Sequence, residues 1–274
     1  DKSLEIIKKY QNKDKRIKVI NNKKNIGLVK SLNKGLNIAK GKYIARMDSD
    51  DISFPQRLEK QYNYLEKNKN VFLLGTGFIN IEYGNKIRTS IILPESPEKI
   101  SKKLPYKNCM HNPTIMLRNE KGLYYREKMW YSEDYDLYLR LLCENKKLAN
   151  LPEKLLKYRY HKNSISLSKR GKQKLFFKKI REFYQQRLLS REDEYEKFDP
   201  DEILKINPNK TKNKTILKQE AFSYFKTNDF EKAKKYCKRY FRYHGFFNKI
   251  FIYYILSFTN KKTVNSIRGL LFQK

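Results

Sequence analysis

The apolar pattern of the first 47 residues alternates between helical and strand periods, and this alternation is the strongest constraint on the fold. Residues 3–10 place apolar side chains at helical spacing, and residues 16–20 alternate apolar with polar side chains as a strand does. Residues 25–41 repeat the helical pattern up to a glycine, and residues 42–47 form a second short strand pattern. This order predicts an α/β fold with a largely parallel sheet.

The same kind of pattern continues to about residue 168 and then changes. We expect a helix after Pro55 and another helix over residues 134–143. Further strands are expected over residues 71–81, 112–117 and 155–160. Lys-rich helical patterns then replace the strands. We therefore expect an α/β domain over residues 1–168 and a helical region over residues 169–274. Residues 215–242 have the helix-turn-helix rhythm of one tetratricopeptide unit, which we expect to pack on the first domain because one unit cannot bury its faces alone.

The chain is strongly basic, with 62 Lys and Arg against 29 Asp and Glu and a formal net charge of +33. Such a charge attracts polyanions of every kind, whether nucleic acid, anionic lipid or phosphorylated substrates. Lys is scattered through every segment, so a compositional bias explains the excess equally well. No pattern resembles a known sequence-reading module, so we expect no specific nucleic-acid partner.

Basic and aromatic residues interleave between residues 234 and 258. This pattern suits a helix lying in an anionic membrane surface, and it equally suits a buried amphipathic hairpin with a solvated Lys face. The apolar run over residues 246–258 is too short to span a membrane, which takes about 20 residues. Three widely separated Cys give no disulfide framework. We therefore expect a cytoplasmic protein. If residues 234–258 lie in an anionic membrane surface, the protein is attached peripherally to the inner face of the cytoplasmic membrane.

An acidic pair follows the second predicted strand. Asp48 and Asp50 are separated by one residue, so along a strand they would point to the same side. Two carboxylates at the edge of an α/β sheet suit a divalent cation that also holds a diphosphate. An isolated pair of this kind is more often a solvated turn with a helix cap, so the surrounding sequence has to decide.

Several further motifs resemble, in the same order, those of the family 2 inverting glycosyltransferases, which have the GT-A fold. The motifs are Asn25-Ile26-Gly27-Leu28, Arg46-Met47-Asp48-Ser49-Asp50-Asp51, Pro55-Gln56-Arg57-Leu58, His111-Asn112-Pro113-Thr114, Glu133-Asp134-Tyr135-Asp136-Leu137 and Tyr158-Arg159-Tyr160-His161. The resemblance covers roughly residues 1–168. It implies a GT-A mixed sheet flanked by helices, followed here by the helical region.

The resemblance also implies a role for particular residues. Asp134 is the expected catalytic base, oriented by Glu133, although a carboxylate at a helix start is also stabilised there by the helix dipole. The expected ligands of Mn²⁺ or Mg²⁺ are Asp48, Asp50 and His161. The residues expected to bind the nucleotide donor are Asp48, Asp50, Asn25, Arg46 and Arg159. On the acceptor side we expect His111 and Trp130, whose indole ring stacks on a sugar.

These assignments imply transfer of a sugar, with inversion, from a nucleotide-diphosphate donor to a hydroxyl of a cell-surface glycan or lipid-linked glycan. Family members begin with a strand, a helix and a second strand that supply the grip on the nucleotide base. Asp1-Lys2-Ser3 resembles the end of that part, so we expect the grip to be missing from this chain. Two other interpretations therefore stay open: an inactive remnant of the enzyme, and a basic adaptor that binds anionic membrane or nucleic acid without catalysis.

Overall fold

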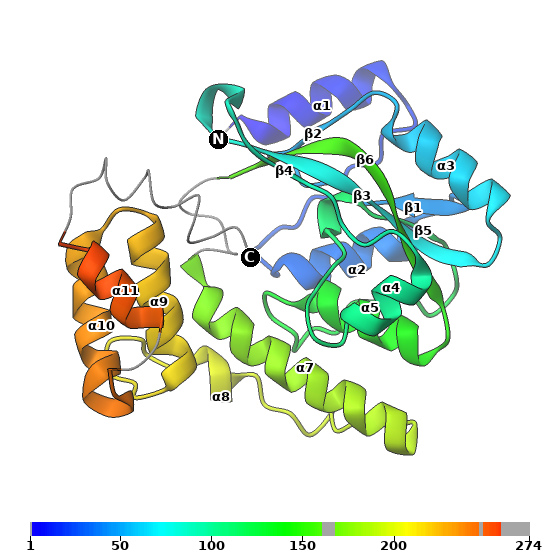
Figure 1. Ribbon diagram of the computed structural model, residues 1–274. Helices are drawn as coiled ribbons and strands as arrows, with labels where there is room; N and C mark the ends of the chain where they lie inside the picture. The colour runs from blue at the N-terminus through cyan, green and yellow to red at the C-terminus, as the bar shows by residue number, and fades with distance from the viewer. Residues whose placement is uncertain (1, 161–167, 247–248, 259–274) are drawn as a thin grey trace.

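A six-stranded mixed sheet forms the centre of the computed structural model, which describes residues 2–160, 168–246 and 249–258 (Figure 1). The sheet order is β1-β5-β3-β6-β2, with β4 paired to β3 beside this path. The strands are β1 Tyr43–Ala45, β2 Ile52–Ser53, β3 Val71–Ile81, β4 Ile87–Ile91, β5 Met116–Arg118 and β6 Lys147–Arg159. The expected mixed sheet is confirmed. The prediction of a largely parallel sheet is wrong, because among the described strands only β3 and β6 run parallel.

Helices flank the sheet and make up the rest of the chain. Those of the first part are α1 Ser3–Lys13, α2 Leu28–Ile38, α3 Arg57–Lys67, α4 Pro97–Lys103 and α5 Glu133–Cys143, with short 3₁₀ turns η1 Tyr83–Asn85 and η2 Asn112–Thr114. Those of the second part are α7 Arg170–Ser190, α8 Asp201–Leu204, α9 Lys214–Lys226, α10 Phe230–His244 and α11 Lys249–Leu256.

Two strand predictions need correction. Over residues 16–20 the expected alternation is present, with Ile17 and Val19 half-buried, but within the described chain the segment pairs with no strand. A strand pattern without a hydrogen-bonding partner stays an extended loop. In the segment 112–117, Pro113 instead opens a 3₁₀ turn, and pairing starts only at Met116.

The central strand β3 is almost continuously apolar, and its first eight residues are all buried. A strand with this composition is typical of a sheet covered on both faces. The glycine at position 77 lets the neighbouring strands come close to β3. A Cβ at Gly77 would lie 2.8 Å from the carbonyl oxygen of Ile91 on β4 and 3.2 Å from that of Glu153 on β6. The absence of a side chain at Gly77 therefore permits the strand spacing on both sides.

Helix α7 belongs to the same hydrophobic core as the helices that cover the sheet. Its side chains Phe176, Ile180 and Phe183 are buried in one cluster with Tyr135 and Leu137 of α5. Helices α9, α10 and α11 form a separate bundle with its own core, made of Leu217, Ala221, Tyr236, Cys237, Tyr240, Phe241 and Ile250. Figure 1 shows α7 running below α5, with this bundle at its amino-terminal end.

We predict that Gly77→Ala lowers the free energy of unfolding by roughly 1–3 kcal/mol, since the new methyl group would press on two backbone carbonyls. Gly35→Ala is the matched control. Gly35 lies inside α2, and a Cβ added there would have nothing within 4 Å, so this change should stabilise the helix by up to about 1 kcal/mol. Urea denaturation measures both. Equal effects of the two changes would contradict the role given to Gly77.

Candidate active site

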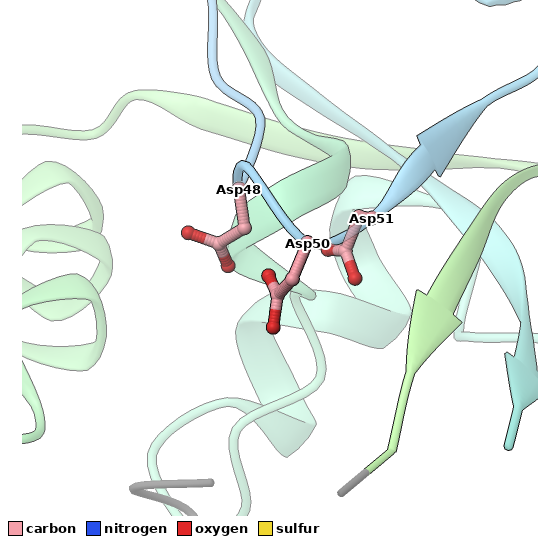
Figure 2. A group of neighbouring side chains, drawn as sticks. All are labelled: Asp48, Asp50 and Asp51. Carbon is pink, nitrogen blue, oxygen red and sulfur yellow. The ribbon is translucent and has the colours of Figure 1, made fainter. Parts of the chain in front are cut away.

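An acidic turn connects β1 to β2 and gathers three carboxylates. The amide of Asp51 donates to the carbonyl oxygen of Asp48 over 3.4 Å, which closes the turn. One carboxylate oxygen from each of Asp48, Asp50 and Asp51 lies within 4.8 Å of the others, and Figure 2 shows the three side chains projecting from this turn. The turn, rather than the strand alternation that we expected, brings Asp48 and Asp50 together. It also adds Asp51, which the sequence reasoning left out although it adjoins Asp50.

Asp51 is the most buried of the three carboxylates, with 7% of its surface exposed. Its Oδ1 accepts from the amide of Arg159 at 2.9 Å, whereas its Oδ2 is buried with no hydrogen-bond partner among the described residues. Burial, together with the charges of Asp50 and Asp48, raises the pKa of Asp51 from 3.8 to about 6. A buried carboxylate oxygen without a partner, next to two further carboxylates, fits a hard divalent cation such as Mg²⁺ or Mn²⁺.

Arg46 connects the acidic turn to the start of α5. Its Nη2 lies 2.6 Å from Oδ1 of Asp48, and only 11% of its side chain is exposed. Its Nε and Nη1 are buried without partners in the described part of the chain. The charge of Arg46 also lowers the pKa of Glu133 and of Asp134 against the effect of burial. The guanidinium group therefore stands within electrostatic reach of both acidic groups.

Glu133 and Asp134 occupy the first turn of α5, where backbone amides point outward. Burial is the main cause that raises the pKa of both carboxyl groups, and their mutual repulsion adds to it for Glu133. Asn108 donates from Nδ2 to Oδ2 of Asp134 over 3.4 Å. Asn108 lies outside every motif, so no sequence pattern pointed to it. A carboxyl group with a raised pKa is a better general base near neutral pH than a free one.

Asp136, in contrast, is tied into structural ion pairs. It is fully buried, and its Oδ2 accepts from Nε of Arg140 at 3.0 Å. Arg126 lies 3.9 Å from its other oxygen. These contacts give Asp136 a structural role.

The other expected site residues lie in different surroundings. The ring of His111 stacks on Phe78 with centroids 3.7 Å apart and meets the edge of Tyr158 at 4.8 Å. Burial lowers the pKa of His111 to about 3, so the ring is neutral and packs as an aromatic group. Trp130 is 42% exposed in the turn that precedes α5.

Arg159 and Asn25 have structural contacts. Nε of Arg159 donates to the carbonyl oxygen of Asp50 at 2.8 Å and so braces the acidic turn. Oδ1 of Asn25 accepts from the amide of Gly27 at 2.9 Å, directly before α2 begins. His161, the third metal ligand that the resemblance implies, lies outside the described residues.

Comparisons with known proteins agree with this fold, a mixed α/β sheet of the GT-A type. The family model for glycosyl transferase family 2 matches residues 1–124. The O-antigen biosynthesis glycosyltransferase WbnJ of Escherichia coli is 38% identical over 189 residues, covering 67% of this chain and 73% of that protein. The chain therefore belongs to the family 2 glycosyltransferases, which confirms the family that the motifs predicted.

Other similar proteins extend the comparison. An uncharacterized glycosyltransferase of Methanocaldococcus jannaschii is 41% identical over 178 residues, or 64% of this chain. The matched part spans 61% of that protein and 59% of a similar glycosyltransferase from Haemophilus influenzae. The structure of residues 1–349 of Staphylococcus aureus TarS in complex with UDP-GlcNAc aligns with a TM-score of 0.52 at 15% identity, covering 98% of this chain and 80% of that one. The likeness to TarS concerns the fold.

A membrane-spanning helix has to be both long and apolar. Across the described residues, no helix meets both requirements.

We predict that Asp51→Asn stabilises the metal-free protein in a pH-dependent way. The pKa of Asp51 is raised in the folded state, so the folded protein holds this proton more tightly than the unfolded one and loses stability as pH rises from about 4 to 6. Asn removes this loss while it keeps an acceptor for the amide of Arg159. The Tm of Asp51→Asn in EDTA should therefore match wild type near pH 4 and exceed it above pH 7.

The control for this prediction is Glu196→Gln, which removes one negative charge from a side chain that is 89% exposed. Its Tm difference from wild type should not grow across the same pH range. A Tm gain for Asp51→Asn that is the same at pH 4 and pH 8 would contradict the raised pKa.

Proposed function

We propose that this chain transfers a sugar from a nucleotide-diphosphate donor to a hydroxyl group of a glycan, with inversion at the anomeric carbon. The observation that carries the proposal is the pairing of two acidic groups through Arg46. The first group is the acidic turn, in which Oδ2 of Asp51 has no hydrogen-bond partner among the described residues. The second group is Glu133 with Asp134. An electrostatic adaptor needs neither group.

The acidic turn would hold a divalent cation, Mn²⁺ or Mg²⁺, through Asp50, Asp48 and Asp51. All three offer hard oxygen ligands, and the buried Oδ2 of Asp51 lacks another partner within the described chain. When bound, such a cation neutralises charge on the leaving diphosphate. Asp51 joins the two aspartates of the sequence prediction because its carboxylate oxygen lies within the same 4.8 Å cluster.

Asp134 would act as the general base. Its carboxylate takes the proton of the acceptor hydroxyl, the acceptor oxygen forms a bond to the anomeric carbon, and the bond from that carbon to the phosphate oxygen breaks with its electron pair on the diphosphate. Asn108 orients the carboxylate through Oδ2, and Glu133 adjoins it in the first turn of α5. Arg46 has two buried N–H groups without partners among the described residues, at Nε and Nη1, which would pair with oxygens of the donor diphosphate.

The names of similar proteins support the classes of donor and acceptor that we propose. TarS was crystallised with UDP-GlcNAc, and WbnJ is named for O-antigen biosynthesis. We accordingly propose a nucleotide-sugar donor and an acceptor on a growing cell-surface glycan or its lipid-linked precursor, with the enzyme at the cytoplasmic face of the membrane.

Two substitutions test the proposal by separating donor binding from chemistry. Asp50→Ala should weaken Mn²⁺-dependent binding of UDP at least about tenfold, because it removes a charged ligand. Asp134→Asn should leave that binding nearly unchanged and lower the turnover of UDP-sugar by roughly 10²–10⁴-fold, because it removes only the basicity. Calorimetry and a UDP-release assay measure the two quantities, and each variant is the control for the other. UDP affinity unchanged in Asp50→Ala would remove the cation assignment.

A second proposal concerns membrane attachment through α11. Ile250, Tyr253 and Tyr254 of this helix pack on α9 and α10. Its other side exposes large apolar side chains by 41–62%, namely Phe251, Ile252 and Ile255, with Phe258 just beyond the helix end. The ammonium group of Lys234 on α10 lies 4.4 Å from the ring of Phe258, so positive charge borders this apolar surface. Such a border suits an anionic lipid surface, where rings enter the interface and Lys reaches phosphates.

The double change Ile252→Ser with Ile255→Ser should abolish sedimentation of the full chain with vesicles of anionic phosphatidylglycerol, while UDP binding stays unchanged. Leu188→Ser with Leu189→Ser is the matched control, since these leucines are 55% and 88% exposed at the end of α7. The control should bind vesicles as wild type does. Equal vesicle binding by both double variants would assign attachment to the dispersed Lys surface instead.

A further inference from the structure

A row of basic side chains runs along one face of α7. Arg170, Lys174 and Arg181 follow one another at intervals of four and seven residues, which place side chains on the same side of a helix, and Lys107 in the loop after α4 joins them. We call these four residues the basic row. In the part of the chain that the structure describes, none of them has a carboxylate within salt-bridge distance. The first turn of α7 also contains no acidic residue, so the helix dipole adds positive charge beside Arg170.

Lys174 lies at the centre of the basic row. Its side chain is half-buried, and its ammonium group lies 5.6 Å from the ring centroid of Phe177. Burial lowers the pKa of Lys174, and the positive charges of Arg170, Arg181 and Lys107 lower it further. A partly buried charge among like charges costs free energy, and a bound anion would remove part of that cost.

The protein itself satisfies a second lysine of α7 but leaves the basic row without such contacts. Lys172 also has a lowered pKa, but its Nζ donates to the carbonyl oxygen of Leu204, and the charge of Glu220 opposes the lowering. Lys174 has neither kind of contact within the described chain. Nε of Arg181 is likewise buried without a hydrogen-bond partner among the described residues. The basic row therefore contains donors that the fold does not use.

The loop after α4 brings the basic row next to the proposed base. The amide of Lys107 donates to the carbonyl oxygen of Lys103 at 3.0 Å, which fixes the loop to the end of α4. The next residue, Asn108, donates from its side chain to Asp134 over 3.4 Å. Only one position in the chain thus separates a residue of the basic row from the side chain that orients the base.

Helix α7 is fixed against the turn before α5. Nε2 of Gln173, the residue before the central lysine of the row, donates to the carbonyl oxygen of Tyr131 at 2.8 Å. The ring of Phe176 meets the ring of Tyr131 edge to face with centroids 6.3 Å apart. The ring of Phe177 packs on that of Tyr135 in α5 with centroids 4.6 Å apart. These contacts hold α7 beside α5, as Figure 1 shows, so the basic row lies next to the first turn of α5.

We propose that the basic row binds oxyanion groups, phosphate or carboxylate, of an anionic acceptor glycan. The inference rests on the proposed function and specifies the class of its acceptor. The donor diphosphate belongs at the acidic turn, so an anion bound next to the base belongs to the acceptor. Arg170 and Arg181 are 11 residues apart in α7, so the row extends roughly 16 Å along the helix. This length suits a glycan with an anionic group on more than one of its sugars.

A flat lipid surface fits the basic row less well than a glycan does. Arg170, Lys174 and Arg181 are all half-buried, so an anionic group has to protrude from a chain to reach them. Lipid binding through rings and aliphatic side chains instead suits the exposed apolar surface of α11 in the separate bundle.

Calorimetry on the full chain tests the basic row with three probes. Tetragalacturonate carries carboxylates along a chain, glucose 6-phosphate carries one phosphate, and maltotetraose is neutral. The buffer contains EDTA, so the metal-free acidic turn repels anions, and about 150 mM NaCl, which screens diffuse charge. We expect wild type to bind at least one anionic probe and not maltotetraose, and the probe that binds tells carboxylate from phosphate. Binding of neither anionic probe, or equal binding of maltotetraose, would overturn the proposal.

The substitution Lys174→Gln removes the central charge and keeps a side chain of similar length. We expect it to weaken binding of the anionic probe about tenfold, since it removes a charge-assisted hydrogen bond. Lys178→Gln is the matched control on the same helix, because Lys178 has 78% of its side chain exposed and lies 3.8 Å from Glu182. The control should bind within about twofold of wild type. Both variants lose one positive charge, so equal weakening would assign the binding to the net charge and overturn the basic row.

A thermal measurement shows whether Lys174→Gln still folds. The substitution relieves repulsion within the row, so we expect its Tm to be no lower than that of wild type. At constant ionic strength, inorganic phosphate should raise the Tm of wild type and of Lys178→Gln more than that of Lys174→Gln. An equal rise in all three proteins would contradict a phosphate site at the row.

Two further measurements separate this inference from its neighbours. Sedimentation with phosphatidylglycerol vesicles should be the same for Lys174→Gln and Lys178→Gln, and a selective loss in Lys174→Gln would assign the row to lipid instead. Calorimetry with UDP and Mn²⁺ tests the proposed function independently. UDP binding that persists while both variants bind the anionic probes equally would overturn the basic row alone. Selective loss of probe binding in Lys174→Gln without UDP binding by wild type would overturn the proposed donor and leave the anion site supported.

Discussion

The site depends on a buried arginine that has no carboxylate within salt-bridge distance among the described residues. Arg57 on α3 is 3% exposed, and its Nη1 donates to the carbonyl oxygens of Arg46 at 3.1 Å and of Pro113 at 2.9 Å. One turn later, Nε2 of Gln61 donates to the carbonyl oxygens of Leu74 and Thr114. Burying a cation costs free energy, and these acceptors offset part of that cost. The bonds of Arg57 and Gln61 fasten α3 to the residue after β1, to the strand β3 and to the turn η2 before β5, and the acidic turn begins directly after Arg46.

The buried acidic groups of the site have raised pKa values, although the chain as a whole is strongly basic. A molecule with a net charge of +33 favours ionised carboxylates at its surface, yet burial raises the pKa of Asp51, Glu133 and Asp134. Arg46 offsets part of this cost by its contact with Asp48 and its reach to α5. Under the proposed function, a bound cation and the proton of the acceptor hydroxyl would relieve the remaining cost.

Sequence reasoning succeeded where one local pattern decided the outcome. The bounds of β3 were predicted to the residue and the start of α5 to within one residue, because a long apolar run and a helical apolar pattern are each decisive. It failed where a distant partner decides, as at residues 16–20, which alternate correctly but pair with no described strand. The contribution of Asn108 depends on contact with a residue 26 positions away, and that of Gln173 on contact across 42. Neither contact leaves a trace in the local sequence.

The shared core of α7 and α5 limits where the sequences of two related enzymes can be joined in a chimera. A chimera joined near residue 168 would take Gln173 and Phe176 from a different parent than the turn at Tyr131, and the two halves would no longer match. A junction between α8 and α9 keeps that contact within one parent, but it divides α7 from α9, where Nε of Arg170 donates to Oε1 of Gln219 at 2.9 Å. The recombination unit that preserves the turn before α5 therefore includes α7, and an exchanged bundle has to present a matching face of α9 to that helix.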